Sequence, residues 1–274
     1  MKFGIVFPSY DSFCNREFAE KLATKAEDEG LDSMLVWDHY MLPYGNRTFD
    51  AYILLSYLAG KTESIRLGTC VTPLPFRNPA MLAKMIATLD RLSEGRVIVG
   101  VGAGWSREEF EGYSEWSEDA TRVRKTEEAL ELMTRLWGEK KVTFKGKFYS
   151  TKGAILEPGP VQKPHPPLWF GTKGKVMMQL AAKYGTGWIP TDITLREYKK
   201  YLSSFGEESI LKENFVFSIS DCPQASIRWR IEFENMPRPD VNTTVWFLVA
   251  KSKKRIDKSK SLGNSRRAFE IGRK

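Results

Sequence analysis

The sequence predicts an α/β fold, a (β/α)8 TIM barrel with one insertion and an atypical C-terminal region, with an open doubly wound sheet as the alternative. Three observations support this prediction. Residues 65–105 form a complete strand–helix–strand pattern, and short apolar strands alternate with amphipathic helices along most of the chain. The length of 274 residues also suits a single barrel.

The central pattern, residues 65–105, places a helix between two strands. Ile65–Cys70 and Val97–Val101 are short and apolar, as expected of strands buried on both faces. Ala80–Leu92 has apolar residues at helical spacing, and Gly95 follows it where helices commonly end. Such a unit makes its two strands parallel neighbours. Both strands end in polar or glycine-rich turns, at the edge where parallel α/β folds bind their ligands.

The remaining elements follow the same alternation. The strands expected outside the central unit are Lys2–Phe7, Ser33–Trp37, Leu168–Phe170, Gly187–Ile189, Asn214–Ser220 and, as an eighth, Thr243–Val249. The helices expected are Arg16–Glu29, Asp50–Lys61, Thr121–Trp137, Val176–Tyr184 and Leu195–Leu211.

An insertion at about residues 138–167 interrupts the alternation. Lys141–Tyr149 has the pattern of an exposed hairpin, and Pro158–Pro167 is an extended, proline-rich run. We expect this insertion to cover the substrate pocket. After about Asp221 the pattern weakens. We expect residues 1–250 to form one barrel domain and residues 251–274 to form a basic tail that ends in a helix at Asn264–Ile271.

Composition is that of a soluble globular protein, with 42% hydrophobic and 28% charged residues. The net charge of +8 lies entirely in residues 251–274, which hold ten Lys or Arg and two Asp or Glu. The neutral remainder argues against nucleic acid as a partner. Three scattered cysteines and two histidines predict neither a disulfide framework nor a metal site. Since no apolar run or signal peptide is found, we expect a cytoplasmic protein without membrane contact.

Three groups of residues at strand ends are candidates for chemistry. His39 follows a strand directly and could transfer a proton, although a loop histidine has the same pattern. Gly102, Ala103 and Gly104 could let a flat ligand approach the backbone, but small residues packed inside a barrel explain them equally well. Gly171-Thr172-Lys173-Gly174 opens a helix and suits a phosphate, or is a plain glycine-rich turn.

Four segments resemble the luciferase-like flavin- and deazaflavin-dependent oxidoreductases. The segments are WDHYMLP at 37–43, RLGTCVTPLPFRNPAMLAKMIATLDRLSEGR at 66–96, GVGAGW followed by Glu108 and Glu109, and PHPPLWFGTKG at 164–174. Spacing and order match from residue 3 to about residue 190. The resemblance implies a TIM barrel that binds coenzyme F420 or FMN, acts on a small organic substrate and forms a homodimer.

The resemblance also implies roles for individual residues. His39 would lie beside the redox ring. Thr69, Cys70 and Val71 would support that ring, with a non-prolyl cis peptide bond between Cys70 and Val71. Residues 171–174 would bind the phosphate of the cofactor. Sugar-phosphate dehydrogenases of this family carry a glutamate where this chain has Trp105, so the resemblance argues against a sugar phosphate substrate.

Three functions therefore remain open from the sequence. The favoured one is hydride transfer between F420 and a small organic substrate. The first alternative is a monooxygenase that uses reduced FMN and O₂. The second, from another class, is a catalytically idle barrel that only binds a ligand.

Overall fold

The structure, a computed structural model, describes residues 2–7, 9–42, 47–190, 196–197, 200–201, 213–217 and 246–252. The predicted elements Leu195–Leu211 and Asn264–Ile271 lie wholly or mostly outside these residues, as does the basic tail after Ser252. Within the described residues, no helix combines the length and the apolar character that crossing a bilayer requires.

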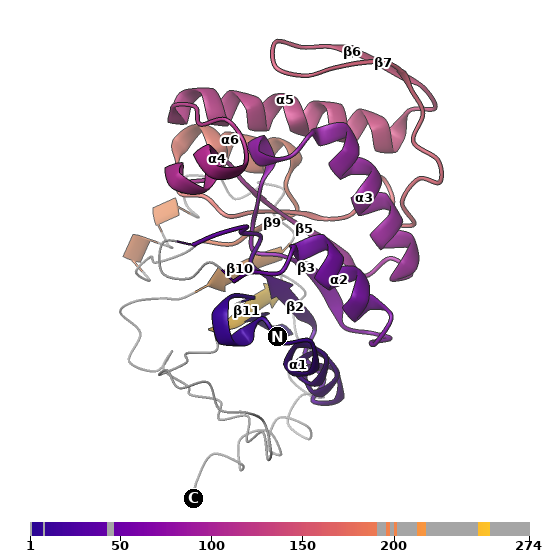
Figure 1. Ribbon diagram of the computed structural model, residues 1–274, viewed down its shortest axis with the longest axis vertical. Helices are drawn as coiled ribbons and strands as arrows, with labels where there is room; N and C mark the ends of the chain where they lie inside the picture. The colour runs from indigo at the N-terminus through magenta and orange to yellow at the C-terminus, as the bar shows by residue number, and fades with distance from the viewer. Residues whose placement is uncertain are drawn as a thin grey trace, which may run out of the picture.

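A curled, nine-stranded sheet forms the centre of the molecule (Figure 1). Its strands are β1 (Lys2–Phe7), β2 (Ser33–Val36), β3 (Arg66–Thr69), β4 (Thr72–Pro73), β5 (Val97–Gly102), β8 (Leu168–Phe170), β9 (Gly187–Trp188), β10 (Glu213–Phe217) and β11 (Trp246–Ser252). They are hydrogen-bonded in the order β3-β2-β1-β11-β10-β9-β8-β5-β4, and β3 also pairs with β5. Because that last pairing connects one end of the order to the other, the sheet curls back on itself.

The strands are parallel except for β11. Parallel pairing links β1, β2, β3, β5, β8, β9 and β10. The predicted alternation of parallel strands with helices is therefore confirmed from β1 to β9. The expected eighth strand, predicted at Thr243–Val249, begins at Trp246 and runs antiparallel to both β1 and β10. A (β/α)8 barrel needs eight parallel strands, so the described pairings depart from it at β11.

Helices cover the outer face of the curled sheet (Figure 1). They are α1 (Arg16–Asp28), α2 (Ala51–Ala59), α3 (Pro79–Leu92), α4 (Arg107–Tyr113), α5 (Asp119–Gly138) and α6 (Lys175–Tyr184). α2 packs on α1 and α3, and α5 packs on α3 and α6. Five of these helices agree with the predicted ones to within two residues at each end, and α4 was not predicted.

Local sequence explains where the central helix begins and ends. Asn78 caps α3, since its side chain accepts hydrogen bonds from the backbone N–H groups of Ala80 and Met81. Pro79 occupies the first turn, where its missing N–H costs nothing. Gly95 follows the helix with φ of 83°, a conformation that favours glycine.

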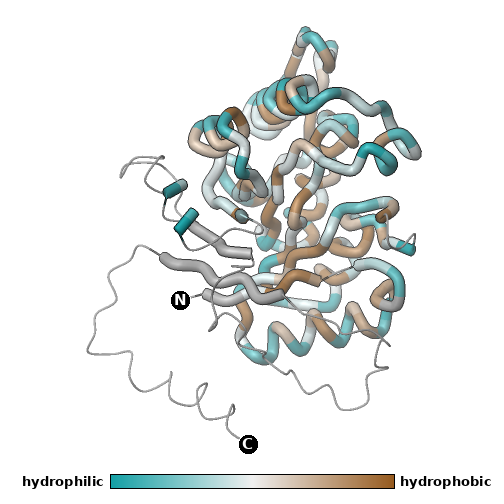
Figure 2. The backbone as a smooth tube through the Cα atoms, turned by 90° about the vertical axis from the view of Figure 1, so that its left-hand side faces the viewer, coloured by the Kyte–Doolittle hydropathy of each residue, from teal (hydrophilic) through white to brown (hydrophobic). Residues whose placement is uncertain are grey.

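Apolar residues make up most of the central strands, which run brown through the centre of Figure 2, and they form two buried clusters. Inside the curl, five fully buried side chains pack together: Val6, Leu35, Ile98, Trp169 and Ile189. Trp37, Cys70 and Val71 are partly buried against this inner cluster. A second, larger cluster fills the space between the strands and the helices.

The insertion does not cover the carboxyl ends of the strands, and this expectation was wrong. It contains a separate hairpin of β6 (Val142–Lys145) and β7 (Ser150–Ala154). Glu128 of α5 accepts hydrogen bonds from the N–H groups of Lys147, Phe148 and Tyr149, at 2.6 to 2.9 Å. The insertion follows the end of α5, where the chain has already returned to the amino ends of the strands. The hairpin therefore lies on the outside of the helical layer, along α5 (Figure 1).

Candidate active site

The predicted site residues lie at the carboxyl ends of four strands that are neighbours in the sheet. His39 follows β2, Cys70 and Val71 follow β3, Gly102 ends β5, and Gly171 follows β8. The pairings β2–β3, β3–β5 and β5–β8 are all parallel, so these strand ends meet at one edge. The structure thus brings the candidates from four distant segments together.

His39 is held by Glu109, a residue that the sequence did not single out as a candidate. The imidazole Nδ1 lies 2.9 Å from Glu109 Oε2. The other oxygen of this carboxylate, Oε1, accepts hydrogen bonds from the backbone N–H groups of Tyr40 and Met41, at 2.6 and 3.4 Å. Glu109 is only 2% exposed. Because a carboxylate accepts hydrogen bonds, it makes Nδ1 the donor and leaves Nε2 of a neutral imidazole with its lone pair.

Two aromatic rings contact His39. The Trp37 ring centroid lies 6.4 Å from that of His39, and the Trp105 ring centroid lies 5.9 Å away, each in an edge-to-face arrangement. Tyr10 stacks on Trp37 with ring centroids 5.3 Å apart. Trp105 remains 59% exposed. The surroundings of His39 are therefore aromatic and apolar.

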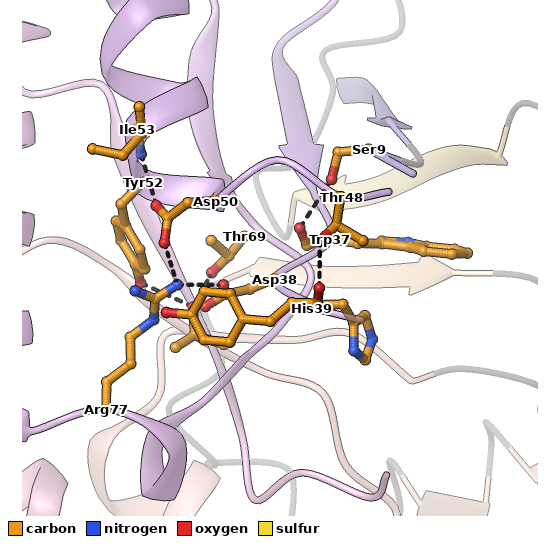
Figure 3. A network of polar contacts seen from close by, with 12 residues as sticks. Ser9, Trp37, Asp38, His39, Thr48, Asp50, Tyr52, Ile53, Thr69 and Arg77 are labelled. Atoms are coloured by element: carbon orange, nitrogen blue, oxygen red, sulfur yellow. Dashed lines mark hydrogen bonds and ion pairs between the residues drawn. The ribbon is translucent and has the colours of Figure 1, made fainter. Parts of the chain in front are cut away.

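A buried ion-pair network lies behind the turn that carries His39 (Figure 3). The Arg77 guanidinium donates to Asp38 at 2.6 Å and to Asp50 at 3.0 Å. It also lies over the rings of Tyr40 and Tyr52, 4.9 and 5.1 Å from their centroids. Burial tends to lower the pKa of Arg77, but the two carboxylates raise it above its ordinary value, so the guanidinium stays charged. Arg77 thereby connects the start of α3 to the turn after β2.

Hydroxyl groups extend this network to β5. The Tyr52 hydroxyl lies 2.9 Å from Thr72 Oγ1, which donates to Thr69 Oγ1 at 3.0 Å. Thr69 Oγ1 in turn accepts from the N–H of Gly100, at 3.2 Å. Thr69 is fully engaged by these contacts and buried. Its side chain connects the ends of β3, β4 and β5, and its role in supporting a bound ring stays a prediction.

The Cys70–Val71 peptide bond is cis, which confirms the sharpest sequence prediction. Val71 fills the space beside two glycines, because a Cβ atom at Gly102 or Gly171 would lie 2.6 or 2.8 Å from a Val71 methyl group. At Gly100 a Cβ atom would lie 1.9 Å from the carbonyl oxygen of Thr69. Gly102 therefore has a packing role, and its contact with a ligand stays a prediction. Burial raises the pKa of the Cys70 thiol to about 12.

The turn at residues 171–174 leads into α6 without a side-chain cap. The N–H of Gly171 donates to Val101 O at 2.9 Å, and the N–H of Gly174 donates to Thr172 Oγ1 at 3.2 Å. Gly174 is the N-cap of α6 and has no side chain to accept from the first turn. Those first-turn N–H groups, with Lys173 and Lys175 next to them, form an electropositive end suited to an anion.

The sequence could have indicated some of the residues that it missed. Asp38 is adjacent to His39, and Arg77 lies in a segment that carried the family resemblance. Glu109 follows the glycine-rich turn by one helical turn, at a distance of 70 residues from His39. A single sequence carries no information on which distant carboxylate faces a given histidine.

The family model described as luciferase-like monooxygenase matches residues 1–209. An F420-dependent glucose-6-phosphate dehydrogenase from Intrasporangium calvum is 35% identical over 196 residues, which is 69% of this chain and 58% of that protein. This chain therefore spans a little over half the length of that curated relative.

Two solved structures are similar as well. One is an F420-dependent secondary alcohol dehydrogenase in complex with an F420-acetone adduct. It is 28% identical, with a TM-score of 0.67 over 78% of this chain and 68% of that one. The other is the monooxygenase RslO1 from Streptomyces bottropensis. It is 32% identical, with a TM-score of 0.67 over 74% of this chain and 64% of that one.

Proposed function

The chain belongs to the luciferase-like monooxygenase family, and from this premise we propose that it is an F420-dependent oxidoreductase that transfers hydride to or from a small organic substrate. The observation that carries the proposal is the His39–Glu109 pair, set among aromatic rings where the carboxyl ends of parallel strands meet. The similarity to two F420-dependent dehydrogenases supports F420 as the cofactor.

The residues at this edge fit a deazaflavin cofactor. Trp37, Cys70 and Val71 are partly buried on the apolar inner cluster and offer a flat, uncharged surface to a ring system. The uncapped amino end of α6, with Thr172 and Lys173, fits a phosphate group. When bound, F420 supplies the hydride chemistry, while the protein supplies position and electrostatics.

In this proposal His39 accepts or donates the proton of the substrate hydroxyl group. Its Nε2 accepts the hydroxyl proton when an alcohol is oxidised, and an Nε2 that carries a proton returns it when a carbonyl is reduced. Glu109 keeps Nδ1 protonated and stabilises the positive charge that the imidazole gains. Arg77 and Asp38 fix the turn after β2, which keeps His39 at a constant position relative to Cys70 and Val71.

We also propose how the chain is organised as a whole. The domain predicted for residues 1–250 closes into an eight-stranded barrel. Because β11 runs to Ser252, the separate basic tail predicted at 251–274 begins after that residue. The insertion at 138–167 decorates the outside of that domain. The protein is a cytoplasmic homodimer.

A second candidate is a monooxygenase that uses reduced FMN and O₂. The similarity to the monooxygenase RslO1 favours it. The same apolar surface would then hold the FMN ring, and the same helix end its phosphate.

Titration of the purified protein with F420 and with FMN tests the proposal. F420 binding, followed by its fluorescence, is expected to be tighter than FMN binding and to weaken by about tenfold or more in the Thr172→Ala/Lys173→Ala double variant. His39→Ala should keep F420 binding and lower hydride transfer by about 10²–10⁴-fold. Tighter binding of FMN would favour the monooxygenase, and binding of neither would leave the idle barrel.

A further inference from the structure

The segment Gly104–Glu109 makes two different contacts with His39. Glu109 binds the imidazole Nδ1, and Trp105 packs its indole ring against the imidazole at an interplanar angle of 73°. The first contact orients the histidine. The second is an edge-to-face contact between the two rings, with centroids 5.9 Å apart, and it calls for a separate explanation.

The position of Trp105 is set by its neighbours in the chain. Gly104 has φ of 80°, and a Cβ atom there would lie 2.5 Å from the Phe110 ring, so the backbone folds tightly onto α4 at this point. Ser106 caps α4, because its Oγ accepts from the N–H of Glu109 at 3.4 Å. The tight turn and the cap fix the backbone on both sides of Trp105, yet the indole is 59% exposed.

The position of the indole restricts what can reach His39. A hydroxyl that bonds to Nε2 brings its carbon next to an imidazole whose ring centroid is 5.9 Å from the indole. Because the indole is 59% exposed beside this imidazole, its surface is within reach of the substituent on that carbon. Sugar hydroxyls placed there would lose water without gaining a partner, whereas an aromatic ring would gain stacking and apolar burial.

We propose that Trp105 selects alcohols and ketones that carry an aromatic ring on the reacting carbon. This inference rests on the proposed function. The reacting C–H hydrogen leaves with its two electrons to F420, which is reduced. The hydroxyl proton goes to His39 Nε2, and the alcohol is oxidised to the ketone. Trp37, which also contacts His39 edge-to-face and on which Tyr10 stacks at 5.3 Å, extends the aromatic surface.

Binding of acetophenone to the F420-free protein provides a test that does not depend on turnover. Measured by saturation-transfer NMR, the dissociation constant should rise about tenfold in Trp105→Ala and stay within about threefold in Trp105→Phe, which keeps a ring. Tyr113→Ala is the matched control. Tyr113 is 61% exposed at the end of α4, the helix that follows Trp105, and it stacks on Tyr40 instead of contacting His39.

Turnover with F420 gives the second readout. Oxidation of 1-phenylethanol should be preferred to that of glucose 6-phosphate, and Trp105→Ala should raise KM by about tenfold with little change in kcat. The inference would be overturned if Trp105→Ala leaves the affinity for acetophenone unchanged, or if the enzyme prefers glucose 6-phosphate. In either case F420 binding would still support the proposed function. Failure of the wild type to bind F420 would overturn both.

Discussion

At the scale of single residues, the Glu109 carboxylate has two tasks that depend on each other. One oxygen accepts from His39, and the other accepts from the backbone of the residues that follow His39. The carboxylate therefore fixes the turn and the imidazole at the same time. Since Glu109 is almost fully buried, its charge is compensated by these donors alone among the contacts described.

A Glu109→Gln variant tests whether the charge of Glu109 matters beyond the packing of its side chain. Glutamine keeps the size of the side chain but removes the charge that stabilises a protonated imidazole. We expect kcat to fall by on the order of 10²-fold or more, with F420 affinity nearly unchanged. ¹⁵N NMR of the imidazole should show Nδ1–H in the wild type and a mixture of tautomers in the variant. A variant with normal kcat and one tautomer would contradict this role.

Cys70 should be chemically inert at neutral pH. Its pKa of about 12 lies well above the ordinary thiol value of 9.0, because burial disfavours the thiolate. At pH 8 the thiolate fraction is then lower by about a thousandfold than that of an ordinary thiol.

A Cys14→Ser/Cys222→Ser variant isolates this thiol. Its alkylation by iodoacetamide should be slow at pH 8 and rise about tenfold per pH unit through pH 10, without levelling near 9. The same variant unfolded in urea is the control and should react at the ordinary rate. Rapid alkylation of the folded protein at pH 8 would show that the thiol is not held in an apolar site.

Sequence reasoning singled out residues whose signal is local. His39 was found because it follows an apolar strand, and the turn at 171–174 because it opens a helix. Glu109 and Arg77 escaped because their roles arise from partners 70 and 39 residues away. Gly102 was singled out for a ligand, which stays a prediction, and the structure adds that a Val71 methyl group leaves no room for a Cβ there.

At the scale of elements, carboxylates on two helices bind the loops that lead into the strands. Glu27 of α1 accepts from the N–H groups of Glu63, Ser64 and Ile65, just before β3. Asp90 of α3 accepts from Gln162 at 2.9 and 2.7 Å, just before β8. These anchors fix the amino ends of two strands, opposite the edge that carries the candidate site.

Glu128 does the same for the β6–β7 hairpin, which leads to a prediction. Glu128→Ala removes three acceptor contacts from the turn at 147–149, so proteolysis there should become at least about tenfold faster. F420 affinity should not change, because the hairpin lies outside, along α5. Glu131→Ala, on an exposed part of the same helix, is the control. Loss of F420 affinity in Glu128→Ala would restore the insertion as a cover of the site.

The elements that the sequence mislocated share a physical cause. Hydrophobic periodicity reports that a segment is a hairpin, but not which face of the molecule it packs on. α4 was missed because its seven residues are too few for a period to emerge, and its start depends on the cap at Ser106. β4 has only two residues and is defined by its partner β5.

At the scale of the whole molecule, β11 connects the two ends of the parallel array. It pairs with β1 from Lys2 to Val6 and with β10 from Glu213 to Phe217. Being antiparallel, it starts at the edge where β10 ends, so no crossing of the sheet is needed between them. Without β11, β1 and β10 would each expose an unpaired backbone edge.

The position of β11 therefore sets where the chain can be shortened. A chain ending at Lys253 keeps every described pair of β11, and we expect it to unfold cooperatively in urea with F420 affinity within about threefold of the full chain. A chain ending at Val245 loses both pairings and should be insoluble or unfold without a cooperative transition, because two strand edges become unpaired.

A chain ending at Ala250 loses only the pairs at Lys251 and Ser252, and its free energy of unfolding should be lower by about 1–2 kcal/mol. If the chain ending at Val245 unfolds as cooperatively as the one ending at Lys253, β11 is dispensable, and the domain proposed for residues 1–250 is complete without its eighth strand.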